Sequence, residues 1–280
     1  YYDISVATEG DTNPETGNVY KTHRACEVGN IFPLSNKFTK PFNCKVDGKE
    51  IIMGCYGIGV GRTMGILAEI FNDEYAYFSS FSDTWLQHCQ AFQREITQEL
   101  GLQTDSFVVE VASNDGYLLQ YFARDGIPCL GIEPTSSTAN AARSKGIDTL
   151  EVFFGSAIAQ KVRDEYGPAD LIIGNNVLAH VPDPLDFLEG VSLLLKEGGV
   201  ASFEFPHLLN LLTLNQFDTI YHEHFSYFSV TAVKNLLERC GLRLVRVQEI
   251  ATHGGSIRIH AVPARDKGVT ANPSVDIVLA

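Results

Sequence analysis

A short apolar run followed by a turn constrains the fold of this chain more than any other feature. Residues 107–111 (FVVEV) have the β-branched composition of a buried parallel strand. The turn residues Asn114-Asp115-Gly116 come next, and residues 117–122 have the apolar spacing of a helix start. A strand, a tight turn and a helix in this order form the ligand cradle of open α/β sheets, although an ordinary βα turn has the same pattern.

Polar residues follow three of the predicted strands. Glu110 lies inside the first apolar run, where a charged side chain needs a ligand or a hydrogen-bond network. The second predicted strand, residues 129–132, leads to Glu133, which can bind ribose hydroxyls or merely cap the next turn. The third, residues 169–173, is followed by Asn175. Carboxyl ends of such strands share one edge of a sheet, so we expect these side chains to converge on one nucleotide-type ligand.

The remaining pattern predicts a doubly wound α/β domain. Residues 82–100 have helical periodicity and are expected to cover the sheet edge ahead of the first strand. A helix that ends at Gly198-Gly199 is expected before a strand over 201–205. Further strands are expected over 242–250 and 256–261, with a helix over 232–239 between the strands. Alternating strands and helices of this kind indicate helices on both faces of a mainly parallel sheet.

Composition excludes several classes of function. The formal net charge of −13 argues against general binding to nucleic acid or to anionic membranes, which requires a basic surface. The 6 cysteines include no C-x-x-C pair, so we expect a reducing, cytoplasmic setting without a zinc site or a disulfide framework. No apolar run approaches the length of a membrane span. The first residue is Tyr1 and the last residues are apolar, so we expect a chain cut at both ends.

The first part of the chain has a separate pattern. Strand-like runs at 25–32 and 49–53 precede a glycine-rich stretch, 54–65, in which Arg62 suits a phosphate or is a plain surface arginine. The strings RACEVGNIFPL and IIMGCYGIGVGR resemble bacterial-type prolyl-tRNA synthetases at the end of their class II core. The resemblance implies a small α+β fragment over 1–68 in which Arg62 contacts ATP. Asn30 replaces the usual histidine, and motifs 1 and 2 have no counterpart, so we expect a fused remnant that does not activate proline.

Two histidine-bearing stretches are candidates for chemistry. The first is NNVLAHVPDP, which contains His180 just after the third predicted strand. The second is DTIYHEHFSYF, in which Tyr221 and Glu223 would share one side of an extended segment and His222 and His224 the other. A histidine between tyrosine and glutamate suits proton transfer. A metal site or a structural loop with satisfied histidines is the alternative.

Several long strings together resemble the sugar C-methyltransferase family, over about residues 71–265. They are EYAYFSSFSDTW, VVEVASNDGYLLQYF, GIEPT, NNVLAHVPDP, EFPHLLNLLTLNQFDTIYHEHFSYFS and THGGSIRIH. Members of this family use S-adenosylmethionine to methylate C3 of nucleotide-linked 4-keto-6-deoxyhexoses. The resemblance implies a Rossmann-like methyltransferase domain over 107–265, a helical lead-in over 69–106, and a truncated C-terminal domain over 266–280. The family's cysteine-ligated zinc region is missing here.

The same resemblance assigns roles to individual residues. It implies that S-adenosylmethionine is held by Glu110, Ser113, Asp115, Gly116, Glu133 and Asn175. It implies that the sugar is surrounded by Tyr75 or Tyr77, His180, Tyr221, Glu223 and His224, with His224 as the base. We therefore expect a nucleotide-sugar substrate, with no nucleic-acid or membrane partner and no metal. The alternatives are an O- or N-methyltransferase for another small molecule, and a non-catalytic chimera.

Overall fold

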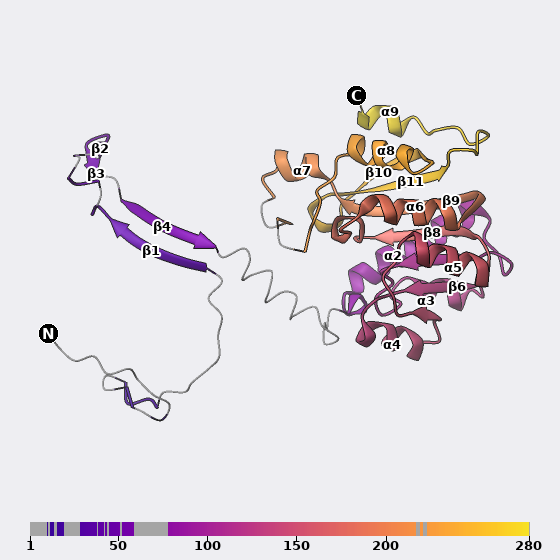
Figure 1. Ribbon diagram of the computed structural model, residues 1–280, viewed down its shortest axis with the longest axis horizontal. Coiled ribbons are helices and arrows are strands. Elements are labelled where there is room, and N and C mark those ends of the chain that lie inside the picture. The colour runs from indigo at the N-terminus through magenta and orange to yellow at the C-terminus, as the bar shows by residue number, and fades with distance from the viewer. Residues whose placement is uncertain are drawn as a thin grey trace. The chain divides into compact units, whose positions relative to one another are not determined.

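The computed structural model divides into two compact units, residues 1–71 and residues 72–280, which are described separately (Figure 1). The structure describes residues 10, 12–13, 16–19, 29–37, 39–41, 43, 45–50, 52–58, 78–216, 219–220 and 223–279. Five residues singled out from the sequence lie outside this set: Arg62, Tyr75, Tyr77, Tyr221 and His222.

The first unit contains two antiparallel strand pairs. Strand β1 (Gly29–Ser35) pairs with β4 (Met53–Ile58), and β2 (Lys45–Val46) pairs with β3 (Lys49–Glu50). The turn between β2 and β3 is Asp47-Gly48, with both φ angles positive, as a two-residue hairpin requires. The strand predicted over 49–53 is therefore divided between β3 and β4, and β4 includes the first of the predicted glycine-rich residues.

The second unit is an α/β domain with a seven-stranded sheet. Its strands are β5 (Val108–Val111), β6 (Cys129–Ile132), β7 (Thr149–Leu150), β8 (Ala169–Asn175), β9 (Leu195–Pro206), β10 (Leu242–Ile250) and β11 (Ser256–Pro263). Its α-helices are α2 (Asp83–Leu100), α3 (Leu119–Arg124), α4 (Ser136–Ser144), α5 (Ser156–Tyr166), α6 (Pro184–Leu194), α7 (Leu208–Thr213), α8 (Val230–Arg239) and α9 (Ser274–Leu279). The 3₁₀ helices that lie wholly within the described residues are η1 (Ser79–Phe81), η2 (Leu178–His180) and η4 (Thr252–Gly254).

The sheet order is β10-β11-β9-β8-β5-β6-β7, in which β11 is antiparallel to both neighbours and the other pairings are parallel. The chain runs outward from β5 to β6 and β7, and then returns to place β8 on the other side of β5. Strand order thus reverses between β5 and β8. Ligands of open α/β sheets bind outside the carboxyl ends of the strands at such a reversal.

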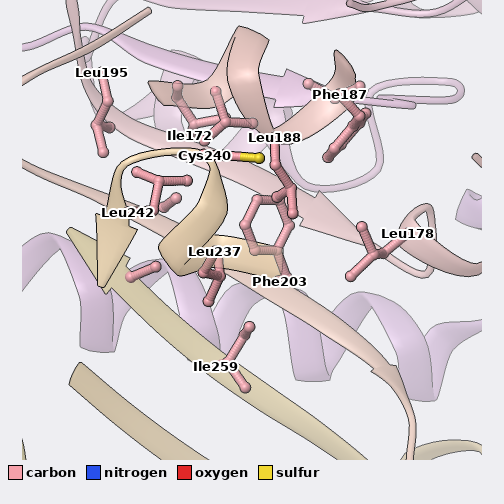
Figure 2. Close-up of a cluster of buried hydrophobic side chains, with 14 of the residues drawn as sticks. Ile172, Leu178, Phe187, Leu188, Leu195, Phe203, Leu237, Cys240, Leu242 and Ile259 are labelled. Carbon is pink, nitrogen blue, oxygen red and sulfur yellow. The ribbon is translucent and has the colours of Figure 1, made fainter. Parts of the chain in front are cut away.

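The two faces of the sheet differ in composition, as the strand register shows. The face that we call the apolar face packs on α5, α6 and α8. Its strand residues are Val109, Val111, Leu130, Ile132, Ile172, Ala201, Phe203, Phe205, Ile257, Ile259 and Ala261 (part of this core is drawn in Figure 2). The face that we call the polar face packs on α2, α3 and α4. Its strand residues include Val108, Glu110, Ile173, Asn175, Ser202, Glu204, Arg258, His260 and Val262.

Two details of the sequence-based description are wrong. Helix α2 covers the polar face rather than a sheet edge, because its apolar stripe of Cys89, Phe92 and Ile96 is buried against that face. The helix expected to end at Gly198-Gly199 ends at Leu194, and the glycines lie inside β9. They belong to an irregularity between β8 and β9, where a Cβ on Gly199 would be 2.9 Å from the Ala169 carbonyl oxygen.

Candidate functional site

Glu110 lies at the carboxyl end of β5, at the point where strand order reverses. Its side chain is fully buried on the polar face, and neither carboxylate oxygen makes a hydrogen bond of standard geometry with a described residue. Burial raises the pKa of Glu110 well above its ordinary value, and interaction with the nearby Tyr117 hydroxyl opposes that rise. A buried carboxyl without a firm partner is the kind of group that a ligand satisfies.

Asn175 ends β8 next to this position and has the same property. It is 6% exposed, and neither its amide nitrogen nor its amide oxygen is hydrogen-bonded within the described part of the chain. Asn176 follows it with a φ of 53°, a left-handed conformation that directs the chain sharply away from the strand end. The end of β8 therefore presents a side-chain amide that none of the described residues hydrogen-bonds.

Glu133 follows β6 and is held in place by backbone amides. Its Oε2 accepts a hydrogen bond from the Asn114 amide at 3.0 Å, and its Oε1 accepts one from the Thr135 amide at 2.9 Å. Each carboxylate oxygen can accept a second hydrogen bond. These contacts therefore orient Glu133 without exhausting its capacity to bind hydroxyl groups.

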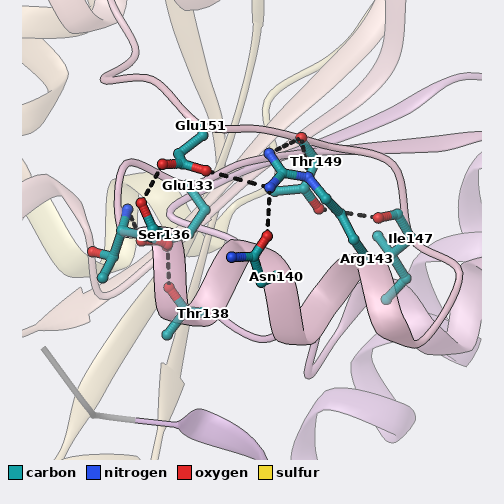
Figure 3. A network of polar contacts seen from close by, with 9 residues as sticks. Glu133, Ser136, Thr138, Asn140, Arg143, Ile147, Thr149 and Glu151 are labelled. Carbon is teal, nitrogen blue, oxygen red and sulfur yellow. Dashed lines mark hydrogen bonds and ion pairs between the residues drawn. The ribbon is translucent and has the colours of Figure 1, made fainter. Parts of the chain in front are cut away.

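A polar network fixes the helix that follows Glu133 (Figure 3). The Arg143 guanidinium on α4 donates to the Thr149 carbonyl oxygen at 2.9 Å and forms an ion pair with Glu151 at 3.3 Å. The Ser136 hydroxyl, at the start of α4, donates to the same Glu151 carboxylate. Both ends of α4 are thus attached to the sheet edge at β7, which fixes the loop containing Glu133.

The loop after β5 has strained backbone and close packing. Ala112 and Asn114 have φ angles of 56° and 50°, which are uncommon for residues with side chains and often occur at functional sites. Gly116 has a φ of 76°, and a Cβ there would be 2.4 Å from Ile147. The Ser113 hydroxyl is buried and would be 2.4 Å from a Cβ on Gly131. Gly116 and Gly131 therefore allow this loop to pack closely on its neighbours, and the Ser113 hydroxyl is buried without a hydrogen bond to a described residue.

Asp115 attaches the same loop to the segment before α2. Its Oδ2 forms an ion pair with Lys145 Nζ at 3.1 Å, and that ammonium also donates to the Asp115 carbonyl oxygen and the Ser80 hydroxyl. The Ser79 amide donates to Asn114 Oδ1 at 2.9 Å. Asp115 is therefore already paired with the Lys145 ammonium through one oxygen, while its Oδ1 is buried and makes no hydrogen bond with a described residue.

His180 and His224 come from two separate histidine-bearing stretches of the sequence and lie side by side in the structure. Their rings meet edge to face with centroids 4.8 Å apart. The Phe225 amide donates to the Ala179 carbonyl oxygen at 2.8 Å, which joins the loop of His224 to η2. His224, with Tyr227, also lines a small pocket beside the end of β9.

The pKa values of both imidazoles are lowered. Burial is the main cause for His180, whose pKa falls to about 4 with a further contribution from His224; a backbone hydrogen bond at Glu223 opposes the fall. Burial also lowers the pKa of His224, and the hydrogen bond with the Thr219 carbonyl opposes it. Since Nδ1 of His224 lies 3.1 Å from that carbonyl oxygen, which only accepts, Nδ1 carries the proton and Nε2 carries the lone pair. His224 is therefore neutral at pH 7 and competent to accept a proton.

Glu223 lies in a turn, so the two-residue alternation of an extended strand does not apply there. Tyr221 and His222 are outside the described residues, as are Tyr75 and Tyr77, and their proposed roles remain predictions. Of the residues that the resemblance placed around a sugar, the structure brings His180, Glu223 and His224 together.

Sequence reasoning missed a buried ionic cluster on the polar face. Glu204 Oε2 contacts Arg258 Nη2 at 2.9 Å and His88 Nε2 at 3.0 Å, and Thr252 donates to Oε1 at 3.0 Å. Burial raises the pKa of Glu204, but His88 and Arg258 more than offset it and hold the pKa below its usual value. The signal was present, since Glu204 and Arg258 interrupt apolar strands as Glu110 does.

The described residues contain neither a cluster of metal ligands nor a helix that could span a membrane. Nowhere among them do three His, Cys, Asp or Glu side chains group as a metal site would require. No described helix has the length and apolar character needed to cross a bilayer.

Comparison with known proteins supports the fold and identifies the family. The chain matches the model of a family described as "Methyltransferase domain" over residues 85–247. It is 37% identical over 196 residues to C-methyltransferase NovU of Streptomyces niveus, which covers 70% of this chain and 47% of that relative. The chain thus spans about half the length of this relative.

Two further similarities concern the first unit and the fold. A segment is 42% identical over 83 residues to proline–tRNA ligase of Leptospira interrogans, covering 28% of this chain and 14% of that protein. The solved structure of magnesium protoporphyrin IX methyltransferase from Synechocystis, with bound SAH, has a TM-score of 0.50 and 16% identity over 72% of this chain and 94% of that chain. This last similarity confirms a Rossmann-like methyltransferase fold for the second unit, whereas a synthetase fold for the first unit is not shown. Over most of its second unit, the chain belongs to the family described as "Methyltransferase domain".

Proposed function

We propose that this protein uses S-adenosylmethionine to methylate a carbon atom of a nucleotide-linked keto-deoxysugar, with His224 as the base. The observation that carries the proposal is the Nδ1 hydrogen bond from His224 to the Thr219 carbonyl oxygen, which leaves the lone pair on Nε2. The similarity to a protein named C-methyltransferase over 70% of the chain supports carbon as the methyl acceptor.

The polar atoms at the strand ends fit the methyl donor. Glu133 has acceptor capacity for the ribose hydroxyls. Asn175 supplies an amide that makes no hydrogen bond with a described residue, and Glu110 supplies a buried carboxyl whose interaction is with the Tyr117 hydroxyl. Magnesium protoporphyrin IX methyltransferase, which has a similar fold, has been solved with bound SAH and with bound SAM. The donor supplies an electrophilic methyl group on a sulfonium, and the chain supplies its orientation. Ser113, Asp115 and Gly116 shape the loop around it.

Carbon methylation requires a nucleophilic carbon beside the ketone. A neutral His224 removes the proton from that carbon, and hydrogen-bond donors stabilise the resulting enolate oxygen. His180 stays neutral at pH 7 because its pKa is about 4, so it can donate a hydrogen bond from its N–H. Tyr221 and Glu223 are the other groups proposed to surround the sugar.

The proton transfer can be tested separately from the methyl transfer. With SAH in place of the donor, wild-type protein in D₂O should exchange the substrate proton beside the ketone, because His224 acts before any methyl group moves. A thymidine diphosphate 4-keto-6-deoxyhexose is the probe, and NMR measures the exchange. His224→Ala should lose both exchange and methylation while SAH still binds. Exchange at the wild-type rate in His224→Ala would assign the base elsewhere.

Donor binding has its own test. Calorimetric titration of the full chain with SAH should give micromolar affinity, about −8 kcal/mol. Glu133→Ala should weaken it at least about tenfold, since ribose hydroxyls lose a charged acceptor. Glu189→Ala, a matched carboxylate on the exposed side of α6, should leave the affinity unchanged. Equal affinities in both variants would contradict the ribose role of Glu133.

A further inference from the structure

Gln216, which lies just after α7, connects the loop that contains His224 to the turn before β11. This turn consists of η4 (Thr252–Gly254) and Gly255. Gln216 Nε2 donates to the Gly254 carbonyl oxygen at 2.6 Å. The Gln216 carbonyl oxygen accepts two hydrogen bonds from Thr219, from its amide at 3.2 Å and from its hydroxyl at 2.8 Å. The Thr219 carbonyl oxygen in turn accepts the hydrogen bond from His224 Nδ1. A continuous series of hydrogen bonds therefore runs from the turn to the imidazole.

Two side-chain amides hydrogen-bond the backbone of this turn, and its glycines make room for them. Gly254 and Gly255 have φ angles of 77° and 115°, which side-chain-bearing residues rarely adopt. A Cβ on Gly255 would be 2.6 Å from Asn210 Nδ2, and a Cβ on Gly254 would be 3.0 Å from Gln216 Nε2. Asn210 Nδ2 also donates to the Gly255 carbonyl oxygen at 3.4 Å. Two glycines thus allow two amides from the α7 segment to approach this backbone closely.

The turn is itself anchored to the buried ionic cluster. The Thr252 hydroxyl donates to Glu204 Oε1, and the Thr252 carbonyl oxygen accepts from the Gly255 amide at 3.0 Å and from the Ser256 hydroxyl at 3.1 Å. Glu204 is fixed by Arg258, which is 3% exposed. The hydrogen-bond series is therefore anchored in the interior of the sheet, at Glu204 and Arg258, rather than in a surface loop.

We infer that Gln216 is a positioning residue that fixes the tautomer and ring orientation of His224. By holding the Thr219 carbonyl oxygen against Nδ1, it keeps the proton on Nδ1 and the lone pair on Nε2. Without the contact to Gly254, the segment that carries the Thr219 carbonyl oxygen loses its attachment to this turn, so we expect the Nδ1 hydrogen bond that selects the tautomer to weaken. The consequence for catalysis rests on the proposed role of His224 as base, whereas the tautomer does not.

The direct test is nitrogen NMR of the histidine rings in the full-length chain at pH 7.5. The resonances of His224 are identified by their loss in His224→Asn. Wild-type protein should show His224 as the Nδ1–H tautomer. Gln216→Met, which keeps the side-chain length but donates no hydrogen bond, should show both tautomers in exchange. A retained single Nδ1–H tautomer in Gln216→Met would overturn the inference.

Controls separate this effect from unfolding. Gln160 on α5 also donates through its amide, to Asp164 at 2.8 Å on the exposed side of that helix, so Gln160→Met should leave His224 unchanged. Gln216→Glu provides a second non-donating variant of nearly the same volume and should repeat the effect of Gln216→Met. SAH affinity should equal wild type in all three, because the donor residues lie at other strands.

Kinetics distinguish failure of the inference from failure of the proposed function. If His224 is the base, kcat of Gln216→Met should fall by up to about 100-fold while KM for the donor stays the same, as expected for a misoriented reacting group. A changed tautomer with unchanged kcat would retain Gln216 as the group that sets His224 and remove His224 from the role of base. An unchanged tautomer would reject the inference whatever the kinetics.

Discussion

The two faces of the seven-stranded sheet are built from the same strands and have opposite characters. The apolar face has aliphatic and phenyl side chains at every strand position that we assign to it, and α5, α6 and α8 cover it. The polar face mixes apolar positions with Glu110, Asn175, Ser202, Glu204, Arg258 and His260, all of them buried. Its polar residues gather toward the carboxyl ends of β5, β8 and β9.

The contrast between the two faces assigns stability mainly to the apolar face and function mainly to the polar face of the same sheet. Burial of apolar surface stabilises the fold without any requirement for exact partners. Buried charges and amides lower stability unless they are paired, so a chain keeps them where a ligand or a network uses them. On the polar face, Glu204 is paired internally, whereas Asn175 has no hydrogen-bond partner among the described residues. We therefore expect substitutions on the two faces to have different signatures.

Phe203→Ala on the apolar face should have the largest effect on stability. Phe203 is fully buried, with its ring centroid 6.0 Å from that of Phe187 (Figure 2), and its removal leaves a cavity. We expect a loss of about 3–5 kcal/mol in the free energy of unfolding. Urea titration followed by fluorescence of Trp85, the single tryptophan, measures it within the second unit. SAH affinity of the folded variant should be unchanged; a large loss of affinity would mean that the faces are coupled.

Glu204→Leu on the polar face should cost about 3 kcal/mol, since it leaves Arg258 buried without its carboxylate. The double variant Glu204→Leu with Arg258→Leu should recover most of that loss, because no uncompensated charge remains. The same urea titration measures both. Additive losses in the double variant would show that the ion pair is not what makes Glu204 sensitive. No recovery of this kind is expected for pairs on the apolar face.

Sequence reasoning located the strand ends of the site because the signal there is local. Glu110 and Glu133 interrupt or end short apolar runs, and a parallel sheet brings such ends together. The apolar face was equally readable from the β-branched strands. The bounds of β5, β6 and β10 therefore differ little from expectation. His180 and His224 are neighbours, whereas their place around a sugar stays a prediction.

The remainder depends on contacts between distant residues. Nothing near Gln216 in the sequence indicates Gly254, 38 residues away, as its hydrogen-bond partner. Helix α2 was misplaced because periodicity identifies its apolar stripe but not the face of the sheet that the stripe covers. Gly198-Gly199 suggested a helix end because glycine pairs occur both at helix ends and at strand irregularities, and composition does not distinguish the two.

His260 should make the polar face sensitive to acid. Burial lowers its pKa to about 4, with Arg246 and Arg258 contributing, whereas the unfolded chain titrates near the ordinary value. Between these values the unfolded state binds a proton that the folded state does not, so stability falls as pH decreases. The loss attributable to His260 should be about 2 kcal/mol from pH 7 to pH 5.

The variant His260→Leu isolates this contribution, because leucine cannot titrate and suits a position that is 6% exposed. The difference in unfolding free energy between pH 7 and pH 5 should shrink by about 2 kcal/mol in the variant. His180 and the other titrating groups are common to both proteins and cancel. An equal pH dependence in His260→Leu would show that His260 is protonated normally in the folded state.

The smallest expected change in stability comes from Asn175→Leu, which should raise the free energy of unfolding and lower SAH affinity. Because the two effects are opposite, this variant separates a role in the fold from a role in ligand binding. Asn175→Leu replaces a buried amide, whose two polar atoms find no hydrogen bond among the described residues, with an apolar group of similar volume. The free energy of unfolding should rise by about 1 kcal/mol, while SAH affinity should fall roughly tenfold because the variant lacks the amide that we propose hydrogen-bonds the donor. Asn235→Leu, on the exposed side of α8, should change neither quantity. If Asn175→Leu lowered stability and left SAH affinity intact, the amide would serve the fold, and the polar face would owe its polar residues to internal pairing rather than to the ligand.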